Sequence, residues 1–406
     1  MTMLSGHNII CFGSERWEYP GLQQTIMRYL SKENRVLFFN SLGTRRIAFD
    51  RTFFRACTRR LTAFFSDNNH APADSVRVLN PHFIPLTYST LATRINRSLI
   101  SRQCRSLVSE MQLSSYILWI GTPVVSPLLN RLSPDLVVYN PVDRYHAFSF
   151  VDSVKMKAYE RQAAQQADVI LCTSTAIRND LLRFNRNTFN VSHGVDFAHF
   201  SAAAQSSCVP DDIRGIRPPI IGYFGGLSER VNYTLIRETA RAYPDASVVL
   251  IGSQLVSLDE IKTIPNVHCL GRKPFSMLPL YLKHFSVCLI PYQVNELMDA
   301  VDPIKLREYF CLGKPVVSSP LPEVAAYDDL VFIGKDTDDF VTKVGLALAE
   351  KDDVLTARRI QIAQQSDWPA KMASISDIIQ EALQRKRGKK RIIGSMYGFK
   401  EANRDQ

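Results

Sequence analysis

A lysine and a glutamate three residues apart have the side-chain chemistry to bind a charged ligand. Lys305 and Glu308 follow Pro303, and proline is tolerated in the first turn of a helix. Helical residues three apart share one face. A lysine beside the N–H groups at a helix start can bind a phosphate, and a glutamate one turn later can accept hydrogen bonds from sugar hydroxyls. Taken alone, the pair could equally be a surface ion pair.

Two glycines and an arginine form a second candidate for phosphate binding. Gly225 and Gly226 directly follow an apolar run that ends at Phe224, and Arg230 comes shortly after them. Glycines let the backbone approach a diphosphate closely. An arginine can place two N–H groups on its oxygens. The alternative is a plain tight turn.

An aspartate in the first half is a candidate general base. Asp143 lies just past the apolar run 136–139, and ligand sites in open α/β sheets lie beyond the carboxyl ends of strands. A carboxylate there could deprotonate an acceptor hydroxyl. Asp143 could instead cap the next helix or pair with Arg144. His146 is a further candidate on the acceptor side, or simply a helix residue.

The loop after the first apolar run is expected to face the same acceptor site. It contains Gly13 and Trp17. Which of its residues contact a sugar does not follow from the sequence.

Short apolar runs must position these residues. Most are rich in valine and isoleucine and do not alternate with polar residues, as is typical of parallel strands buried on both faces. Helix-length amphipathic segments separate them, which predicts βαβ units and doubly wound sheets. The runs are 8–12, 35–39, 116–120, 136–139, 168–172 and 190–192, then 219–224, 247–251, 267–270, 287–290, 315–318 and 330–333.

The series of runs begins twice, so we expect two Rossmann-like domains. The polar, proline-containing segment 210–219 is interpreted as the linker. The predicted domains are 1–208 and 209–365. A helix over 366–384 is expected to pack back on the first domain, and 385–406 is expected to be a basic, mobile tail.

The segment around the lysine and glutamate resembles the donor-binding motif of GT-B glycosyltransferases, chiefly family 4. The matching residues are Pro303, Lys305 and Glu308, followed by Gly313-Lys-Pro-Val-Val. In that family the lysine contacts the nucleotide diphosphate, and the glutamate, the second acid of its motif, holds the ribose. The first acid position is occupied here by Ala300, next to Asp299.

Further segments extend this resemblance over roughly residues 8–375. Residues 222–230 are similar to the family's glycine loop followed by a basic residue. Residues 191–200 are similar to the element that closes its first domain, with His193 in place of an asparagine. The stretch that ends at Gly271 and Arg272 resembles the part that contacts the nucleotide base.

The resemblance implies a GT-B fold, with two Rossmann-like domains facing each other across a cleft. It implies that domain 1–208 binds the acceptor and that domain 209–365 binds the nucleotide-sugar. It implies a hexosyltransferase-like enzyme that moves a sugar from a nucleotide-diphosphate-sugar to a lipid-linked saccharide in bacterial surface or exported polysaccharide assembly. The nucleotide-sugar is a co-substrate, and no cofactor is expected. No metal is expected either, because Arg230 and Lys305 can offset the diphosphate charge. The acidic pair Asp336 and Asp338 is interpreted as a helix cap.

Two other functions are kept open. One is a UDP-sugar 2-epimerase of the same fold, which would need several acids and a histidine in the cleft. The other is a nucleic-acid-binding protein that uses the basic first half, although the usual recognition motifs are missing. The apolar content of 46% and charged content of 22% exclude collagen-like, coiled-coil and wholly disordered chains.

The positive charge is concentrated in the first half. Residues 1–200 hold 23 Lys and Arg against 14 Asp and Glu, whereas residues 201–406 hold 26 against 25. This asymmetry predicts an anionic partner, for which a membrane surface is favoured over nucleic acid.

The most basic stretch, 43–107, contains a segment whose pattern fits a helix at a membrane surface. In a helical projection of residues 47–65, aromatic side chains that include Phe54 and Phe64 share a face, and three arginines flank it. These arginines are Arg51, Arg55 and Arg59. The alternative is a helix that packs on the core with a solvated basic side.

The cysteines and the N-terminus predict a cytoplasmic enzyme at the inner face of the membrane. None of the eight cysteines forms a CxxC pair, and four lie in apolar runs where a free thiol acts as a small hydrophobe. No signal peptide is visible, and no stretch reaches the ~20 apolar residues of a membrane span.

Overall fold

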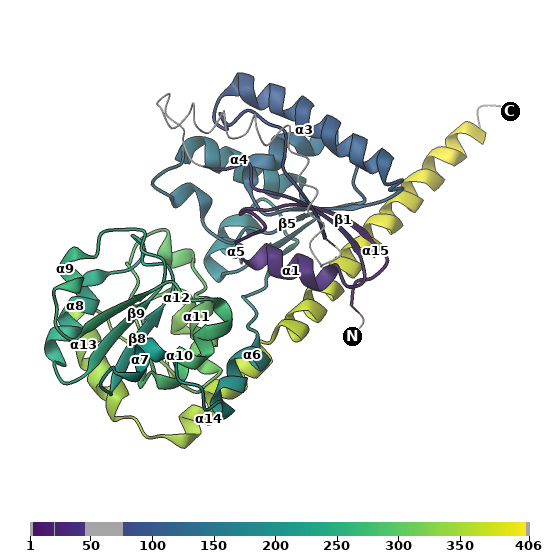
Figure 1. The fold of residues 1–406 in the computed structure, drawn as a ribbon. Helices are drawn as coiled ribbons and strands as arrows, with labels where there is room; N and C mark the ends of the chain where they lie inside the picture. The colour runs from purple at the N-terminus through teal and green to yellow at the C-terminus, as the bar shows by residue number, and fades with distance from the viewer. Residues whose placement is uncertain (1–2, 20, 45–75, 403–406) are drawn as a thin grey trace. The chain divides into compact units, whose positions relative to one another are not determined.

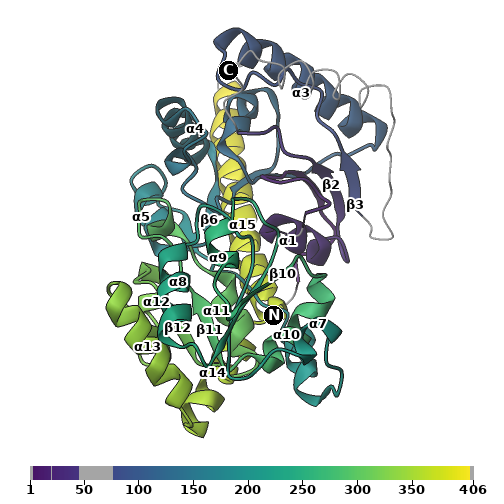
Figure 2. The same ribbon diagram turned by 60° about the vertical axis from the view of Figure 1, so that its left-hand side comes forward.

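The computed structural model describes residues 3–19, 21–44 and 76–402, with side chains described as far as residue 388. The chain forms two compact units, one made of residues 1–191 with 372–406 and the other of residues 192–371. Each unit is a parallel β-sheet with helices around it (Figures 1 and 2).

The first unit contains a seven-stranded parallel sheet in the order β3-β2-β1-β4-β5-β6-β7. Its central strands are buried on both faces, which explains their unbroken apolar sequence. The strands are β1 (Asn8–Phe12), β2 (Arg35–Phe39), β3 (Val76–Leu79), β4 (Ile117–Ile120), β5 (Leu136–Tyr139), β6 (Val169–Cys172) and β7 (Thr188–Asn190).

Helices flank this sheet, and η1 packs against both α3 and α4. Ser89 caps α3 by accepting a hydrogen bond from Ala92 N, and Asp152 caps α4 through Lys155 N. The elements are α1 (Leu22–Leu30), α3 (Thr90–Glu110), η1 (Pro123–Arg131), η2 (Tyr145–Ala147), α4 (Ser153–Gln166), α5 (Thr175–Leu182) and α15 (Trp368–Ala402), of which α15 enters this unit at Met372.

The second unit contains a six-stranded parallel sheet in the order β10-β9-β8-β11-β12-β13. Its core includes every residue of β9 from Val248 to Ile251 and every residue of β11. The strands are β8 (Ile220–Phe224), β9 (Ser247–Ile251), β10 (Val267–Gly271), β11 (Val287–Ile290), β12 (Val316–Ser318) and β13 (Phe332–Ile333).

The second sheet is likewise surrounded by helices, with α8 packed on α13 and α11 on α14. These elements are α6 (Phe197–Ser201), η3 (Ala202–Gln205), α7 (Asp211–Arg214), α8 (Tyr233–Ala242), α9 (Asp259–Lys262), η4 (Phe275–Met277), α10 (Leu278–His284), η5 (Met298–Ala300), α11 (Ile304–Phe310), α12 (Pro322–Ala325), α13 (Thr337–Ala349) and α14 (Asp353–Gln365).

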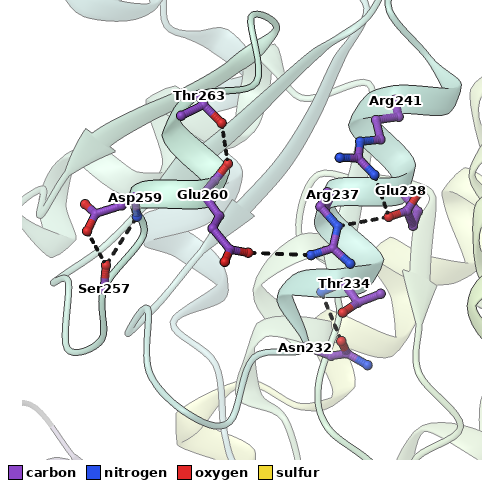
Figure 3. A network of polar contacts seen from close by, with 9 residues as sticks. All are labelled: Asn232, Thr234, Arg237, Glu238, Arg241, Ser257, Asp259, Glu260 and Thr263. Atoms are coloured by element: carbon purple, nitrogen blue, oxygen red, sulfur yellow. Dashed lines mark hydrogen bonds and ion pairs between the residues drawn. The ribbon is translucent and has the colours of Figure 1, made fainter.

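The helices that follow β8 and β9 are linked to each other (Figure 3). Asn232 caps α8 by accepting a hydrogen bond from Thr234 N at 3.1 Å. Arg237 of α8 pairs with the neighbouring Glu238 at 2.9 Å and reaches Glu260 of α9 at 3.8 Å. These contacts fix the ends of the two loops that leave the sheet beside the candidate site.

The boundary between the units lies at 191/192 and not at the expected 208/209. The reason is a pairing between two distant segments of the second unit. Val195 N donates to Ser366 O at 2.9 Å, and Trp368 N donates to Val195 O at 3.1 Å. Gly194 lies against the Trp368 ring, where a Cβ would come within 2.7 Å. Residues 192–208 are therefore part of the second unit.

The C-terminal segment differs from the expectation in its length. The helix predicted over 366–384 is present, and Met372, Ile375 and Ile379 are buried. Lys386 forms an ion pair with Asp168 in the first unit at 2.5 Å. The residues predicted as a mobile tail from 385 onward continue as helix to Ala402.

Within the part of the chain that the structure describes, no helix is both long and apolar enough to cross a bilayer. The described cysteines carry free thiols, and Cys57 lies outside the described residues.

Candidate functional site

Lys305 lies in the first turn of α11, and this helix begins directly after its N-cap residue, Pro303. Its Nζ atom donates a hydrogen bond to the Tyr292 hydroxyl at 3.0 Å. The same ammonium lies 5.7 Å from the ring centroids of both Tyr223 and Tyr292. Two aromatic faces therefore hold the lysine in place without neutralising its charge.

The glycine loop after β8 lies against this lysine. Gly225 has a φ of +146°, and a Cβ there would come within 2.1 Å of Lys305 Cε. Gly252, which follows β9, has a φ of +157°, and a Cβ there would come within 1.7 Å of Gly225 O. Only glycine fits these two positions. The structure thus brings together Gly225 and Lys305, which the sequence predicted as parts of one site, and adds Gly252.

The other predicted donor residues lie on neighbouring loops. A Cβ on Gly226 would meet only Leu255, at 3.7 Å, so the space around it is open. Gly271 has a φ of +70° and its carbonyl accepts a hydrogen bond from Gly252 N at 2.9 Å. The adjoining Arg272 is exposed. These loops all leave the same edge of the sheet.

Burial and the groups around Lys305 shift its pKa in opposite directions. Burial opposes the ammonium form, whereas Tyr292 and Glu308 favour it, and the result is a raised pKa for Lys305. The positive charge of Arg230 also acts on this group and lowers its pKa. A buried ammonium group beside an open glycine loop is suited to an anionic ligand such as a diphosphate.

Glu308 lies one turn further along α11 and is only 7% exposed. Burial raises the pKa of Glu308 to about 7, and the nearby Lys305 lowers it by a smaller amount. A carboxyl group in this environment gains from hydrogen-bond donors. Ribose hydroxyls would supply them.

A buried ion pair that the sequence reasoning missed fixes the start of α11. Arg307 Nη1 donates to Asp302 Oδ1 at 2.7 Å, and both side chains are less than 5% exposed. Asp302 Oδ2 also accepts a hydrogen bond from His193 N at 2.9 Å. The only available sequence signal was a charged residue directly before Pro303.

A buried alanine, Ala300, occupies the position that holds the first acid of the donor-binding motif in GT-B glycosyltransferases. Ala300 ends the short helix η5 and is 0% exposed, whereas the neighbouring Asp299 is partly exposed. Residue 300 therefore offers no carboxylate, and the adjacent carboxylate in this segment belongs to Asp299.

Asp143 follows β5, as expected, and its negative charge contributes to raising the pKa of the buried Tyr145, after burial itself. Of the alternative roles for Asp143, capping of the next helix is not observed, because other residues occupy the N-cap positions of η2 and α4. Arg144 pairs with Asp180 at 2.9 Å, and Arg144 occupies the N-cap position of η2. Asp152 caps α4.

His146 is engaged by a carboxylate that the sequence did not indicate. Its Nδ1 atom lies 2.5 Å from Glu160 Oε2, and both side chains are largely buried. Glu160 comes from the middle of α4, so its distance in sequence concealed the pairing. The contact orients the imidazole ring.

Two of the predicted acceptor residues are buried in the first unit. Trp17 is 7% exposed, packs edge-on against Phe38 with ring centroids 4.9 Å apart, and is covered by Arg28 at 4.8 Å. Gly13 also lies against Phe38, where a Cβ would come within 2.3 Å. Both residues shape the loop after β1 by packing.

The loop after β1 is held by a glutamine that the sequence reasoning missed. Gln23 of α1 accepts a hydrogen bond from Ser14 N at 2.9 Å and donates to Asn140 O at 3.0 Å. Tyr145 donates to Gly121 O at 2.5 Å in the same region. The carboxyl ends of β1, β4 and β5 are thereby joined.

Two remaining predictions have different outcomes. Asp336 is the N-cap of α13 and accepts a hydrogen bond from Asp339 N at 2.9 Å, as predicted. The predicted membrane residues lie outside the described residues; they are Arg51, Arg55, Arg59, Phe54 and Phe64.

Known proteins resemble the chain in both sequence and fold. Residues 218–350 match the family model described as Glycosyl transferases group 1. The putative teichuronic acid biosynthesis glycosyltransferase TuaH of Bacillus subtilis is 27% identical over 274 residues, which cover 62% of this chain and 68% of the relative. The predicted resemblance to group 1 glycosyltransferases is confirmed: residues 218–350 match the group's model, and the chain is similar over 274 residues to a glycosyltransferase.

Solved structures confirm the GT-B fold. HepE of Anabaena, in complex with UDP and glucose, has a TM-score of 0.61 and 16% identity, covering 92% of this chain and 99% of that one. Sucrose-phosphate synthase of Thermosynechococcus elongatus has a TM-score of 0.68 and 15% identity, with coverages of 94% and 100%. A UDP-forming trehalose-phosphate synthase of Burkholderia xenovorans has a TM-score of 0.63 and 13% identity, with coverages of 93% and 98%.

Proposed function

We propose that this chain transfers a sugar from a UDP-sugar to a saccharide acceptor. The observation that carries the proposal is the contact between Gly225 and Lys305, which places an open glycine loop beside a lysine on the same helix as the buried carboxyl group of Glu308. Such a site would receive the diphosphate of the donor and the hydroxyls of its ribose. The structures of HepE with UDP and glucose and with UDP-glucose support the choice of uridine.

In this proposal Lys305 and Arg230 stabilise the charge that develops on the leaving diphosphate. Two cations from fixed elements can do this without a metal ion. The metal requirement is tested by adding EDTA to the transfer assay. Unchanged turnover is the expected result, and loss of activity that Mg²⁺ or Mn²⁺ restores would overturn this part of the proposal.

The proposed acceptor is a lipid-linked saccharide at the cytoplasmic face of the membrane. The similarity to a teichuronic acid biosynthesis enzyme supports a role in bacterial surface polysaccharide assembly. The excess positive charge of residues 1–200 supports a position near anionic lipid. Asp143 is the proposed base that takes the proton of the acceptor hydroxyl.

The experiment is an assay of UDP release from a panel of UDP-sugars, with and without lipid extracts as acceptor. We expect slow hydrolysis of one UDP-sugar and faster release when the acceptor is present. Formation of a 2-epimer without UDP release would favour the epimerase alternative. If no nucleotide-sugar is consumed under any condition, the proposed function is wrong.

A further inference from the structure

The outer face of α3 carries exposed apolar side chains at helical spacing. Leu91, Ile95 and Leu99 recur every four residues and are 69%, 39% and 37% exposed. Residues at this spacing form one stripe along a helix. A fourth exposed apolar residue, Val154, is 81% exposed in the first turn of α4. In the described part of the first unit, Tyr19 is the only other large apolar residue that is exposed to this degree.

Arginines accompany this stripe along the helix. α3 contains four arginines and no lysine, and its one acidic residue, Glu110, is paired with Arg77 at 3.0 Å. Arg94, Arg102 and Arg105 are exposed on the same side as the leucines. The outer face of α3 is therefore both apolar and strongly positive.

A groove between α3 and α4 adds further cations. It has a volume of about 370 Å³, and its lining includes Arg94, Arg97, Lys155 and the rings of Tyr88 and Tyr159. No carboxylate is among its described lining residues. The Nε atom of Arg97 is buried and has no hydrogen-bond partner within the described part of the chain. The groove is thus suited to an anionic group that can accept hydrogen bonds.

A second groove at the other end of α3 has the same character. Arg105 and Arg131 line it, together with serines and apolar residues, and no described lining residue is acidic. In Figure 2, α3 runs along the outside of the first unit.

We propose that the outer face of α3, with the grooves at its two ends, is the surface that docks on an anionic lipid bilayer. Leu91, Ile95, Leu99 and Val154 enter the headgroup region, and the arginines bind lipid phosphates. This inference deepens the proposed function, because it names the surface through which the enzyme reaches a lipid-linked acceptor. It places that surface on α3, whereas the segment 47–65 that the sequence suggested lies outside the described residues.

The combination of features favours a bilayer over other anionic partners. The phosphates of a nucleic acid would pair with the arginines, but a stripe of exposed aliphatic side chains would add little to its binding. An amphipathic helix with arginines beside leucines gains from both apolar insertion and attraction to anionic lipid. Each basic residue near such a surface adds to the binding, and salt weakens it.

The test is sedimentation of the full chain with vesicles of phosphatidylcholine alone or mixed with phosphatidylglycerol. We expect binding only to the mixed vesicles, decreasing as salt is raised. Arg94→Glu with Arg102→Glu should weaken binding by about 30-fold or more. Leu91→Ser should weaken it by about 3-fold or more while leaving the salt dependence in place.

Matched controls come from the second unit. Val354 is 68% exposed, so Val354→Ser removes an equally exposed apolar side chain. Lys335→Glu with Lys351→Glu reverses two exposed charges outside α3. Both control proteins should bind vesicles as the wild type does. Each variant should also keep the stabilisation by UDP that the wild type shows, which confirms that it is folded.

Three outcomes would overturn the proposal. The first is a wild type that does not bind anionic vesicles at low salt. The second is that the α3 variants bind vesicles as well as the controls do, and that vesicle binding is lost only when Arg51, Arg55 and Arg59 are replaced by glutamate. The third is binding to DNA as tight as binding to vesicles, with no effect of Leu91→Ser. If the chain binds vesicles but UDP does not stabilise it, the docking surface on α3 is supported and the proposed function is wrong.

Discussion

At the scale of single residues, the site depends on a lysine held between two tyrosine rings. The hydrogen bond from Lys305 to Tyr292 and the contact with Gly225 define where the ammonium lies before any ligand arrives. A charge held in advance needs no reorganisation when negative charge develops on a leaving group. The same contacts explain why the loop after β8 requires glycine.

The first prediction follows from this placement. Lys305→Ala should lower kcat/KM by about 100-fold or more, because the leaving diphosphate loses a cation in the transition state. The measurement is steady-state UDP release. Lys335→Ala, which removes an exposed lysine at the start of the segment before α13, should leave kcat/KM unchanged. Near-normal turnover in Lys305→Ala would contradict the assignment.

The second prediction concerns the titration of Glu308. Burial raises the pKa of Glu308 to about 7 from an ordinary value of 4.5, so the folded chain retains a proton that the unfolded chain releases. The free energy of unfolding should therefore fall as pH rises from about 4.5 to about 7. Glu308→Gln stays neutral and lacks this dependence. Without ligand, the wild type should lose about 3 kcal/mol relative to Glu308→Gln across this window.

Denaturant unfolding at several pH values measures this difference. Parallel stability curves for the wild type and Glu308→Gln would contradict the prediction. Bound UDP should reduce the difference, because ribose hydroxyls would stabilise the carboxylate form.

The third prediction concerns the acceptor side. Asp143→Asn should abolish transfer to the acceptor and leave UDP binding unchanged, because the amide cannot accept the hydroxyl proton. Transfer and UDP binding are measured on the same preparation. Asp180→Asn, which disturbs the neighbouring Arg144 pair, is the control and should retain transfer. Full transfer by Asp143→Asn would leave the aspartate with a structural role.

At the scale of elements, the strands were largely predictable from the sequence. Most of the predicted runs agree with the observed strands to within two residues, because strands buried on both faces need unbroken apolar sequence. The strand β3 was missed. Only Val76 of its four residues is buried, so an edge strand of this kind lacks the signal.

The candidate site was predictable in part. Lys305, Glu308 and the glycine loop form local motifs, and the structure brings Gly225 to Lys305. The pairs Asp302–Arg307 and His146–Glu160 were missed. Both join residues whose partnership depends on burial and on helix packing, and a single sequence shows neither.

The fourth prediction belongs to α11 as an element. The Asp302–Arg307 pair is buried, so Asp302→Ala leaves a buried guanidinium without its carboxylate partner. This variant should lower the free energy of unfolding by about 3–5 kcal/mol. The exposed pair between Asp329 and Arg358 provides the comparison, and Asp329→Ala should cost less than about 1 kcal/mol. Both are measured by urea unfolding. Equal costs for the two variants would contradict the view that the buried pair fixes the start of α11.

At the scale of the whole molecule, the two units differ in charge as their proposed roles require. Residues 1–191 with 372–406 hold 31 Lys and Arg against 17 Asp and Glu, whereas residues 192–371 hold 18 against 22. A basic first unit suits an acceptor at an anionic membrane. In the second unit the buried lysine of the candidate site is Lys305, whose pKa the positive charge of Arg230 lowers.

The central claim is that the loops of the second unit bind a nucleoside diphosphate through Lys305. Titration of UDP into the full chain, followed by calorimetry, tests it most directly. The account predicts saturable binding at one site, affinity reduced at least 10-fold in Lys305→Ala, and wild-type affinity in Lys335→Ala. No heat of binding for the wild type, or equal affinity in Lys305→Ala, would contradict it.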